Sequence, residues 1–133
     1  MKTITAVTAF LLLISSRTEA VAIEIERQPL IRHNVELNGH PFAIYEKRAD
    51  ASAEIIVLIH GKTISALPNF DPQHDPKNIS LMDAFVAKGF TTYAIDLRGF
   101  GNTPRDAFIS KFTRQKIMDD MADDVLRLAL GKV

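Results

Sequence analysis

The chain has 133 residues, a length that suits one domain. Its hydrophobic fraction of 47% is ordinary for a globular protein, and its 16 basic residues balance its 16 acidic residues, so composition gives no indication of nucleic-acid binding. The chain has no cysteine, which excludes disulfides, thiol catalysis and cysteine-ligated metal sites.

The N-terminus has the layout of a secretory signal peptide. Lys2 supplies a positive charge, residues 3–14 are uncharged and mostly apolar, and small residues follow at 18–20 and 20–22. The apolar segment is shorter than the ~20 residues that a membrane span needs, and no later run is long enough. We therefore expect residues 1–22 to be removed and residues 23–133 to be secreted or periplasmic. The alternative is an uncleaved anchor at the membrane surface.

The exported part is predicted to begin with strands. Residues 23–26 alternate apolar and acidic side chains, and residues 31–48 contain Asn38-Gly39, the strongest short signal for a hairpin turn. A two-residue turn there fixes the pairs on one face of the hairpin, which are Leu37 with His40, Val35 with Phe42, and His33 with Ile44. We expect that face to be buried and the other to be wetter.

A strand–helix–strand unit follows the hairpin. The continuous aliphatic run at 55–59 is typical of a central parallel strand. A long proline-containing connection at 60–78 precedes a short helix, which Ser80 and Asp83 are expected to cap and Gly89 to end. Residues 90–95 form the second parallel strand.

The long connection also holds a small polar cluster. His74 lies between Asp71 and Asp75 in sequence, among several prolines. We expect this cluster to lie on a solvent-exposed loop.

Residues 96–106, "DLRGFGNTPRD", are rich in turn-forming residues and follow directly after that second strand. In open α/β sheets this end of the strands is where ligands bind. The Gly99-x-Gly101 pair does not fit a dinucleotide site, because Pro104 occupies the position of the third glycine and no helix begins at once.

The last predicted element is a helix at 113–130. Its apolar stripe is predicted to face the core. Its four aspartates are expected on the solvated side, although their clustering alone could suggest a metal site. These sets are Ile117, Met121, Val125 and Leu128 for the stripe, and Asp119, Asp120, Asp123 and Asp124 for the solvated side.

Two motifs give the chain a family resemblance. The segments "VLIHG" at 57–61 and "GFTTYAIDLRGFGNT" at 89–103 stand about thirty residues apart, and "MADDVLRLAL" follows in a helix. In this order they resemble the N-terminal half of an α/β-hydrolase, across residues 23–133. The second motif, Asp-x-Arg-Gly-x-Gly-x-Ser/Thr, is matched at Asp96, Arg98, Gly99, Gly101 and Thr103. The resemblance implies a partial α/β-hydrolase fold, in which an antiparallel hairpin leads into a parallel βαβ sheet.

The resemblance also implies roles for the loop after the first motif. The backbone N–H of Lys62, with Thr63 beside it, would stabilise negative charge on a substrate carbonyl oxygen. Gly61 would allow the backbone to approach the substrate closely. His60 would support the loop and would not act as the catalytic base. The substrate would be a small acyl compound, with no cofactor and no metal.

The rest of the catalytic machinery is absent from this sequence. None of the six serines lies in a Gly-x-Ser-x-Gly frame, and no triad acid or histidine can be identified. One interpretation is the N-terminal fragment of an exported serine hydrolase acting on esters, amides or related compounds, inactive as this chain alone. The alternative is a non-catalytic secreted α/β binding module.

The family resemblance also bears on the sheet edge. In the α/β-hydrolases the strand that carries the nucleophile lies beside the strand that ends in His-Gly. We therefore expect residues 55–59 to lie at an open edge and to favour self-association.

Overall fold

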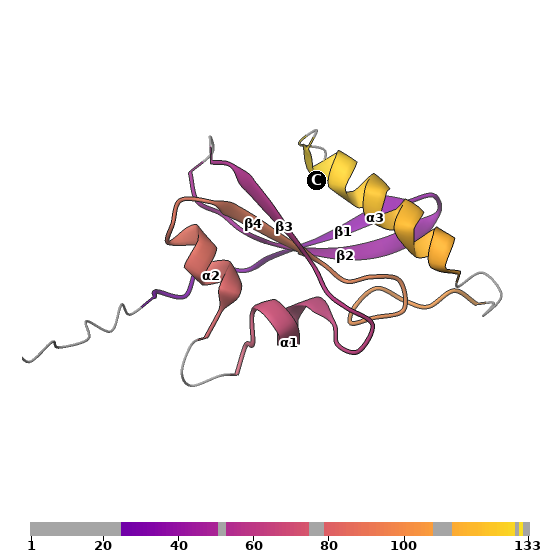
Figure 1. The fold of residues 1–133 in the computed structure, drawn as a ribbon, viewed down its shortest axis with the longest axis horizontal. Helices are drawn as coiled ribbons and strands as arrows, with labels where there is room; N and C mark the ends of the chain where they lie inside the picture. The colour runs from indigo at the N-terminus through magenta and orange to yellow at the C-terminus, as the bar shows by residue number, and fades with distance from the viewer. Residues whose placement is uncertain (1–24, 51–52, 75–78, 108–112, 130, 132–133) are drawn as a thin grey trace, which may run out of the picture.

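The structure is a computed structural model that describes residues 25–50, 53–74, 79–107, 113–129 and 131. The predicted signal peptide, residues 1–22, lies outside the described residues. No helix in the described part is long and apolar enough to cross a membrane. The elements in chain order are β1 (Ile31–Leu37), β2 (His40–Lys47), β3 (Ile55–Ile59), α1 (Ala66–Phe70), α2 (Leu81–Val86), β4 (Thr91–Ile95) and α3 (Arg114–Ala129) (Figure 1).

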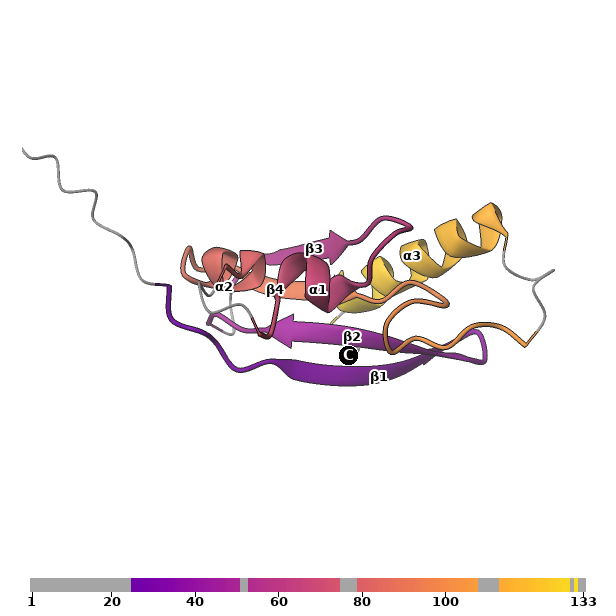
Figure 2. The same ribbon diagram turned by 90° about the horizontal axis from the view of Figure 1, so that it is seen from below.

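The strands form one mixed sheet in the order β1-β2-β4-β3. Figure 1 views this sheet along its edge, with α1 and α2 on one side and α3 on the other, and Figure 2 shows the strands from below. The β1-β2 and β2-β4 pairs are antiparallel, whereas β3 and β4 are parallel. The prediction of a hairpin that leads into a parallel βαβ unit is therefore confirmed.

The hairpin has the predicted turn and register. Asn38 and Gly39 both have positive φ, 52° and 73°, as a type I′ turn requires. Leu37 lies opposite His40, Val35 opposite Phe42, and His33 opposite Ile44. A two-residue turn leaves no freedom for another register, which is why the sequence sufficed.

The expectation of a wetter second face is wrong for β2. Ala43 and Tyr45 on that face are 1% exposed, and they pack with Ala66, Met82 and Ala94. The opposite face is also covered, since Ile44 and Ile95 pack there with partly buried neighbours. Because β4 pairs with β2 on the side away from β1, β2 is an interior strand with helices over both faces.

Strand β3 lies at one end of the sheet and pairs only with β4 in the described part of the chain. Its aliphatic composition predicts a central strand. In the structure, Ile55 is exposed and the other four side chains are half buried. The prediction of an open edge is confirmed, and the expected central position is not found among the described strands.

The helices largely follow the sequence. Helix α2 begins after Ser80, whose Oγ accepts from the Asp83 N–H at 3.0 Å, as a cap should. Helix α3 occupies the predicted C-terminal segment. Helix α1 was missed, because its Ala-Leu-Pro-Asn-Phe sequence is short and contains Pro68, which suggested a loop.

Candidate functional site

The loops that follow β3 and β4 meet at one edge of the sheet. These strands are parallel, and Ile59 lies opposite Ile95 at their carboxyl ends. The residues that follow, 60–65 and 96–106, carry the C-terminal parts of both motifs found in the sequence. The tertiary structure thus brings together two segments that are separated by more than thirty residues in sequence.

The Asp96 carboxylate is the centre of this region. It is 1% exposed, and its Oδ1 accepts from the Ala66 N–H at 2.8 Å. Its Oδ2 accepts from the Tyr45 hydroxyl and from the Asn102 N–H, both at 2.8 Å. These three bonds satisfy a buried charge and join β2, the start of α1 and the loop after β4.

Tyr45 is held protonated at this centre. Burial raises the pKa of its phenol to about 12, and the neighbouring Asp96 adds to the rise, while the bond from the Asn102 amide opposes it. The Asn102 side chain donates to the Tyr45 oxygen at 2.6 Å. The hydroxyl is therefore a fixed donor to Asp96 and a fixed acceptor from Asn102.

Gly101 and Thr103 complete the loop around Asp96. Gly101 has φ +52°, and a Cβ atom there would lie 2.0 Å from Asp96 Oδ2. The Thr103 hydroxyl donates to the Asp96 carbonyl at 2.7 Å and accepts from the Ala43 N–H at 2.9 Å. The Gly and Thr of the motif are thus explained by the close wrapping of the backbone around one carboxylate.

Arg98 joins this loop to α3. Its Nε and Nη2 donate to the two oxygens of Asp120 at 2.7 and 3.0 Å, and its Nη1 donates to Asp106 at 2.8 Å. The guanidinium also lies over the ring of Phe42, 5.2 Å from its centroid. The hydrogen bonds to Asp120 raise the pKa of Arg98 further above its usual range.

The assignment of Asp120 to a solvated helix face is therefore wrong. Its side chain is 1% exposed and holds a buried cation, whereas Asp119 is exposed. Helical periodicity placed the four aspartates together but could not show that Arg98 would approach one of them. Among the described residues, no group of three or more His, Asp or Glu side chains is arranged to hold a metal ion.

His60 fixes the end of β3 and has neither ring nitrogen free. Its Nε2 accepts from the Leu97 N–H at 3.0 Å, and its Nδ1 lies 2.5 Å from the Gly61 carbonyl. Since Nε2 accepts, Nδ1 carries the proton and the ring is the neutral tautomer. The Phe100 ring packs edge-on against it, with 5.1 Å between centroids.

The predicted oxyanion loop projects from this fixed base. Gly61, Lys62 and Thr63 are exposed, although His60 immediately before them is buried. The Lys62 N–H donates to no group in the described part of the chain. An exposed backbone donor on a loop tied down at both ends, by His60 and by the Ala66–Asp96 bond, is suited to binding a small anionic oxygen.

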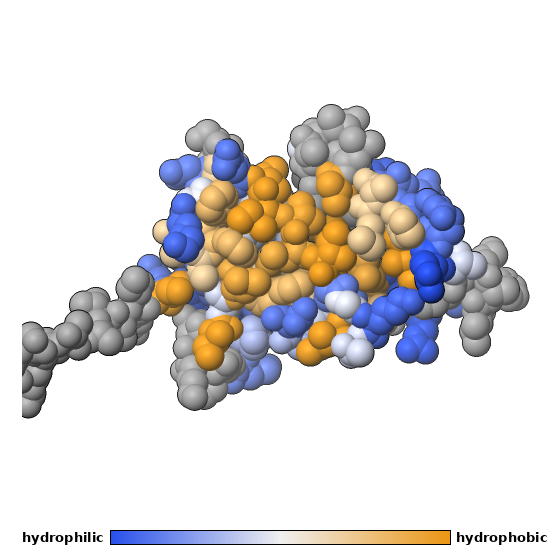
Figure 3. All heavy atoms as spheres, in the orientation of Figure 1, coloured by the Kyte–Doolittle hydropathy of each residue, from blue (hydrophilic) through white to orange (hydrophobic). Residues whose placement is uncertain are grey.

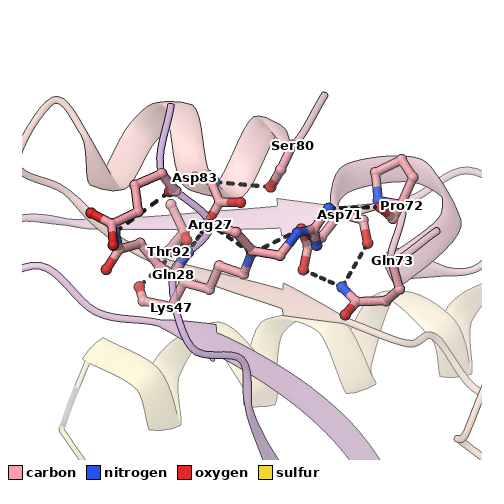
Figure 4. A network of polar contacts seen from close by, with 10 residues as sticks. Arg27, Gln28, Lys47, Asp71, Pro72, Gln73, Ser80, Asp83 and Thr92 are labelled. Atoms are coloured by element: carbon pink, nitrogen blue, oxygen red, sulfur yellow. Dashed lines mark hydrogen bonds and ion pairs between the residues drawn. The ribbon is translucent and has the colours of Figure 1, made fainter. Parts of the chain in front are cut away.

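A second buried network lies at the C-terminal end of β2, on the same face of the sheet as Tyr45 (Figure 4). The fully buried Lys47 Nζ donates to Asp71 at 2.9 Å and to Asp83 at 2.7 Å. Asp83 Oδ1 also accepts from the Gln28 N–H at 2.9 Å, and the Asp71 carboxylate accepts from Arg27 at 3.4 Å. This network fastens the end of α1 and the first turn of α2 to the sheet.

The solvent-exposed cluster expected around His74 is therefore wrong in one respect. His74 is exposed, but Asp71 is 0% exposed and paired with Lys47, and Asp75 lies outside the described residues. The sequence contains no signal for this pairing, since Lys47 stands between the charged residues Glu46 and Arg48, and its burial follows only from the packing of α1 and α2 over β2.

Comparisons with known proteins give the fold but no closer relationship. No protein-family model and no curated protein matches the chain. Solved structures do match. A thioesterase domain from the curacin biosynthetic pathway has a TM-score of 0.60 at 14% identity, covering 74% of this chain and 33% of its own.

Two further structures match over a similar region. The epoxide hydrolase VrEH1 from Vigna radiata has a TM-score of 0.56 at 24% identity, covering 77% of this chain and 28% of its own. The haloalkane dehalogenase variant DbeA-M1 from Bradyrhizobium elkanii has a TM-score of 0.54 at 20% identity, covering 77% and 29%. These neighbours have the α/β-hydrolase fold, and this chain spans about a third or less of their length.

Proposed function

We propose, from the premise that this chain has a partial α/β-hydrolase fold, that it forms the oxyanion loop and the front of the substrate pocket of an exported serine hydrolase. The substrate class is a small ester, amide or related acyl compound, and no cofactor or metal takes part. The observation that carries the proposal is the Lys62 N–H, a donor with no partner among the described residues, on an exposed loop whose base is fixed by His60. Thr63 lies beside it and Gly61 precedes it.

The role of the loop follows from the charge that acyl transfer creates. When a nucleophile attacks a carbonyl carbon, negative charge develops on the oxygen, and a donor already in place stabilises it without reorganisation. One such donor contributes about 2.7–4 kcal/mol to lowering the barrier. The nucleophile and its base must come from outside the 133 residues, because no Gly-x-Ser-x-Gly frame occurs among them. The chain by itself is proposed to be inactive.

The test compares two substitutions that differ only at the backbone donor. In the complete product of the gene that contains this sequence, Lys62→Pro removes the N–H, whereas Lys62→Ala keeps it and removes only the side chain. With nitrophenyl esters we expect Lys62→Pro to lower kcat about 10²–10³-fold and Lys62→Ala to change it little. Circular dichroism of both variants controls for folding.

Three results would overturn the proposal in different ways. Equal losses in the two variants would mean that the side chain, not the N–H, matters. Turnover by the 133-residue chain alone, abolished by a fluorophosphonate, would reveal a nucleophile within it. Absence of turnover in the complete product would leave the non-catalytic α/β binding module.

We also propose that the protein leaves the cytoplasm after removal of residues 1–20 or 1–22. The support is the positive charge, apolar segment and small residues of the N-terminal sequence. N-terminal sequencing of the expressed protein tests this proposal. Recovery of an intact Met1 in the soluble fraction would contradict it.

A further inference from the structure

The buried network at the C-terminal end of β2 holds an amine between two carboxyl groups (Figure 4). The Lys47 Nζ lies 2.7 Å from Asp83 Oδ1 and 2.9 Å from Asp71 Oδ1, and all three side chains are 0% exposed. A primary amine and a carboxyl group can condense to an amide with loss of water. In solution, hydration and the rarity of productive encounters oppose this reaction, and the fold removes both obstacles here.

Water is excluded from this network on several sides. Thr92, opposite Lys47 on β4, and Met82, next to Asp83 on α2, are both 0% exposed. Ile56 of β3 lies opposite Thr92 in turn, and Figure 3 shows a continuous hydrophobic surface over β3. A lysine amine that is removed from water is a stronger nucleophile than a hydrated one.

The two oxygens of Asp83 have unequal surroundings. Oδ1 accepts from the Gln28 N–H at 2.9 Å as well as from Lys47. Oδ2 is buried and has no hydrogen-bond partner among the described residues. Buried polar atoms are normally paired, so this oxygen requires an explanation. It is also the oxygen that Asp83 can lose without breaking a hydrogen bond.

Asp71 differs from Asp83, because both of its oxygens are paired. Gln73 donates to Oδ2 at 2.5 Å, and Arg27 donates to Oδ1 at 3.4 Å. Loss of either oxygen would break these contacts. Asp71 is therefore suited to accept a proton from Lys47 and to pass it on, as a general base and acid does.

We propose that Lys47 and Asp83 form an intramolecular amide, an isopeptide bond, after the chain has folded, with Asp71 as the proton carrier. The ion pair in the structure is the reactant. This modification site is independent of the proposed hydrolase function.

The reaction is a condensation that releases one water molecule. Asp71 carries one proton from the Lys47 ammonium to Asp83 Oδ2, which leaves a neutral amine beside a neutral carboxyl group. The amine nitrogen attacks the Asp83 Cγ atom and forms the new C–N bond. A second proton then moves from the nitrogen to Oδ2, the C–Oδ2 bond breaks, and water leaves. The third proton stays on the amide nitrogen, Asp71 ends as it began, and nothing is oxidised or reduced.

The product keeps the contacts of the site and removes its unpaired atom. Asp83 Oδ1, now an amide oxygen, still accepts from the Gln28 N–H, and the amide N–H still donates to Asp71. One buried cation and one buried anion disappear, while Arg27 remains as the cation beside Asp71. Because buried charges are costly, the interior favours the neutral amide over the ion pair.

The amide would join β2 to α2 across 36 residues. The chain has no cysteine and cannot form a disulfide, so this bond would supply a covalent cross-link by other means.

The first experiment is a tryptic digest of the purified protein, analysed by mass spectrometry. Trypsin cuts after a free lysine and not after one whose amine is bound in an amide. We expect peptide 33–48 joined to peptide 78–88, lighter than the sum of the two by about 18 Da, the mass of one water. Fragmentation of the joined species should place the link at Lys47 and Asp83.

The second experiment compares three substitutions. Lys47→Arg keeps the positive charge without the nucleophilic amine, and Asp71→Asn keeps the shape without the proton acceptor, so both should abolish the joined species. Asp119→Asn is the control, because it makes the same chemical change at an exposed position on α3 and should leave the joined species intact. Circular dichroism compares the folding of the three variants.

Each contrary outcome overturns part or all of the inference. Complete cleavage after Lys47 in the unmodified protein would exclude the bond, whether or not the variants fold. A link from Lys47 to peptide 63–77, which contains Asp71, would refute Asp83 as the acceptor. A joined species in folded Asp71→Asn would refute Asp71 as the proton carrier.

Discussion

At the scale of single residues, the site depends on a backbone that passes very close to a carboxylate. Gly101 can do so because it has no Cβ atom and adopts φ +52°. Asp96 cannot retreat, because Tyr45 and the Asn102 N–H hold the oxygen concerned. Strain at this position would therefore spread to every segment that Asp96 joins.

Substituting Gly101 by alanine should lower the free energy of unfolding by about 2–4 kcal/mol, since steric overlap adds to the cost of positive φ. Gly39→Ala is the control, because Gly39 has φ +73° but no atom within 4 Å of the added Cβ. It should cost about 1 kcal/mol. Urea unfolding measures the loss of stability in both variants. Equal losses would show that the Asp96 carboxylate moves aside to make room for the added Cβ atom.

The two tyrosines should titrate late in the folded protein. Burial raises the pKa of Tyr45 and of Tyr93 to about 12 each, and neighbouring carboxylates, Asp96 and Glu46, add to the rise. The unfolded chain releases these protons near pH 10, so stability is full below pH 10 and falls between pH 10 and 12. Absorbance of tyrosinate at 295 nm should show no transition near pH 10 until urea is added.

Tyr45→Phe is the control for that titration, because it leaves one late tyrosine, Tyr93, in the folded state. A folded-state transition near pH 10 in the unmodified chain would contradict the hydrogen bonds of the two phenols to Asp96 and Glu46.

At the scale of elements, buried ion pairs act together with apolar packing to fix the short helices. Helices α1 and α2 have only five and six residues and cannot be stable alone. The Lys47 ammonium is bonded to Asp71 after α1 and to Asp83 in α2, with all three side chains fully buried. One cation therefore sets the position of two helices.

Lys47→Met should lower the free energy of unfolding by about 3–5 kcal/mol, because it removes the cation that the buried carboxylates of Asp71 and Asp83 share and leaves Asp71 with only its longer contact to Arg27. Lys116→Met is the control, since the Lys116 ammonium lies 3.1 Å from Asp120 but its side chain is 34% exposed. Removing that pair should cost about 1 kcal/mol or less. Chemical denaturation of the two variants distinguishes these values, and equal losses would mean that the Lys47 site is hydrated.

Helix α3 is attached in a similar way. Val125 of its apolar stripe is 39% exposed, so the stripe is only partly buried by the described elements. The paired bonds between Arg98 and Asp120 supply a specific attachment to the loop after β4. An ion pair with fixed geometry gives the helix one position where apolar contact alone would not.

At the scale of the whole molecule, the described sheet has two edge strands, of which β1 carries charged side chains and β3 carries none. If two copies of the 133-residue chain by itself pair through β3, association stabilises the folded state by mass action. The midpoint temperature of thermal unfolding should then rise as protein concentration increases from about 1 to 100 µM, because only folded chains associate into dimers. Ile55→Lys should have a midpoint independent of concentration, and a concentration-independent midpoint in the unmodified chain would contradict pairing.

The sequence by itself determined the local structure of this protein. The Asn38-Gly39 turn, the aliphatic strand 55–59, the Ser80 cap and the order of the four strands, α2 and α3 follow from backbone conformation and side-chain periodicity, which act over a few residues. The two loop motifs and their separation predicted the partial α/β-hydrolase fold that the solved structures match. Residues 60–63 were likewise placed correctly on one loop at the carboxyl end of a strand.

Only the tertiary structure decided which polar side chains are buried and with what. Asp71 and Asp120 looked like solvated residues, and β2 was expected to have a wet face, because a sequence does not show which distant elements will cover a residue. Lys47 lies 24 residues from Asp71, and Arg98 lies 22 from Asp120. Burying such charges costs several kcal/mol unless a partner arrives with good geometry, and that depends on how the elements pack together.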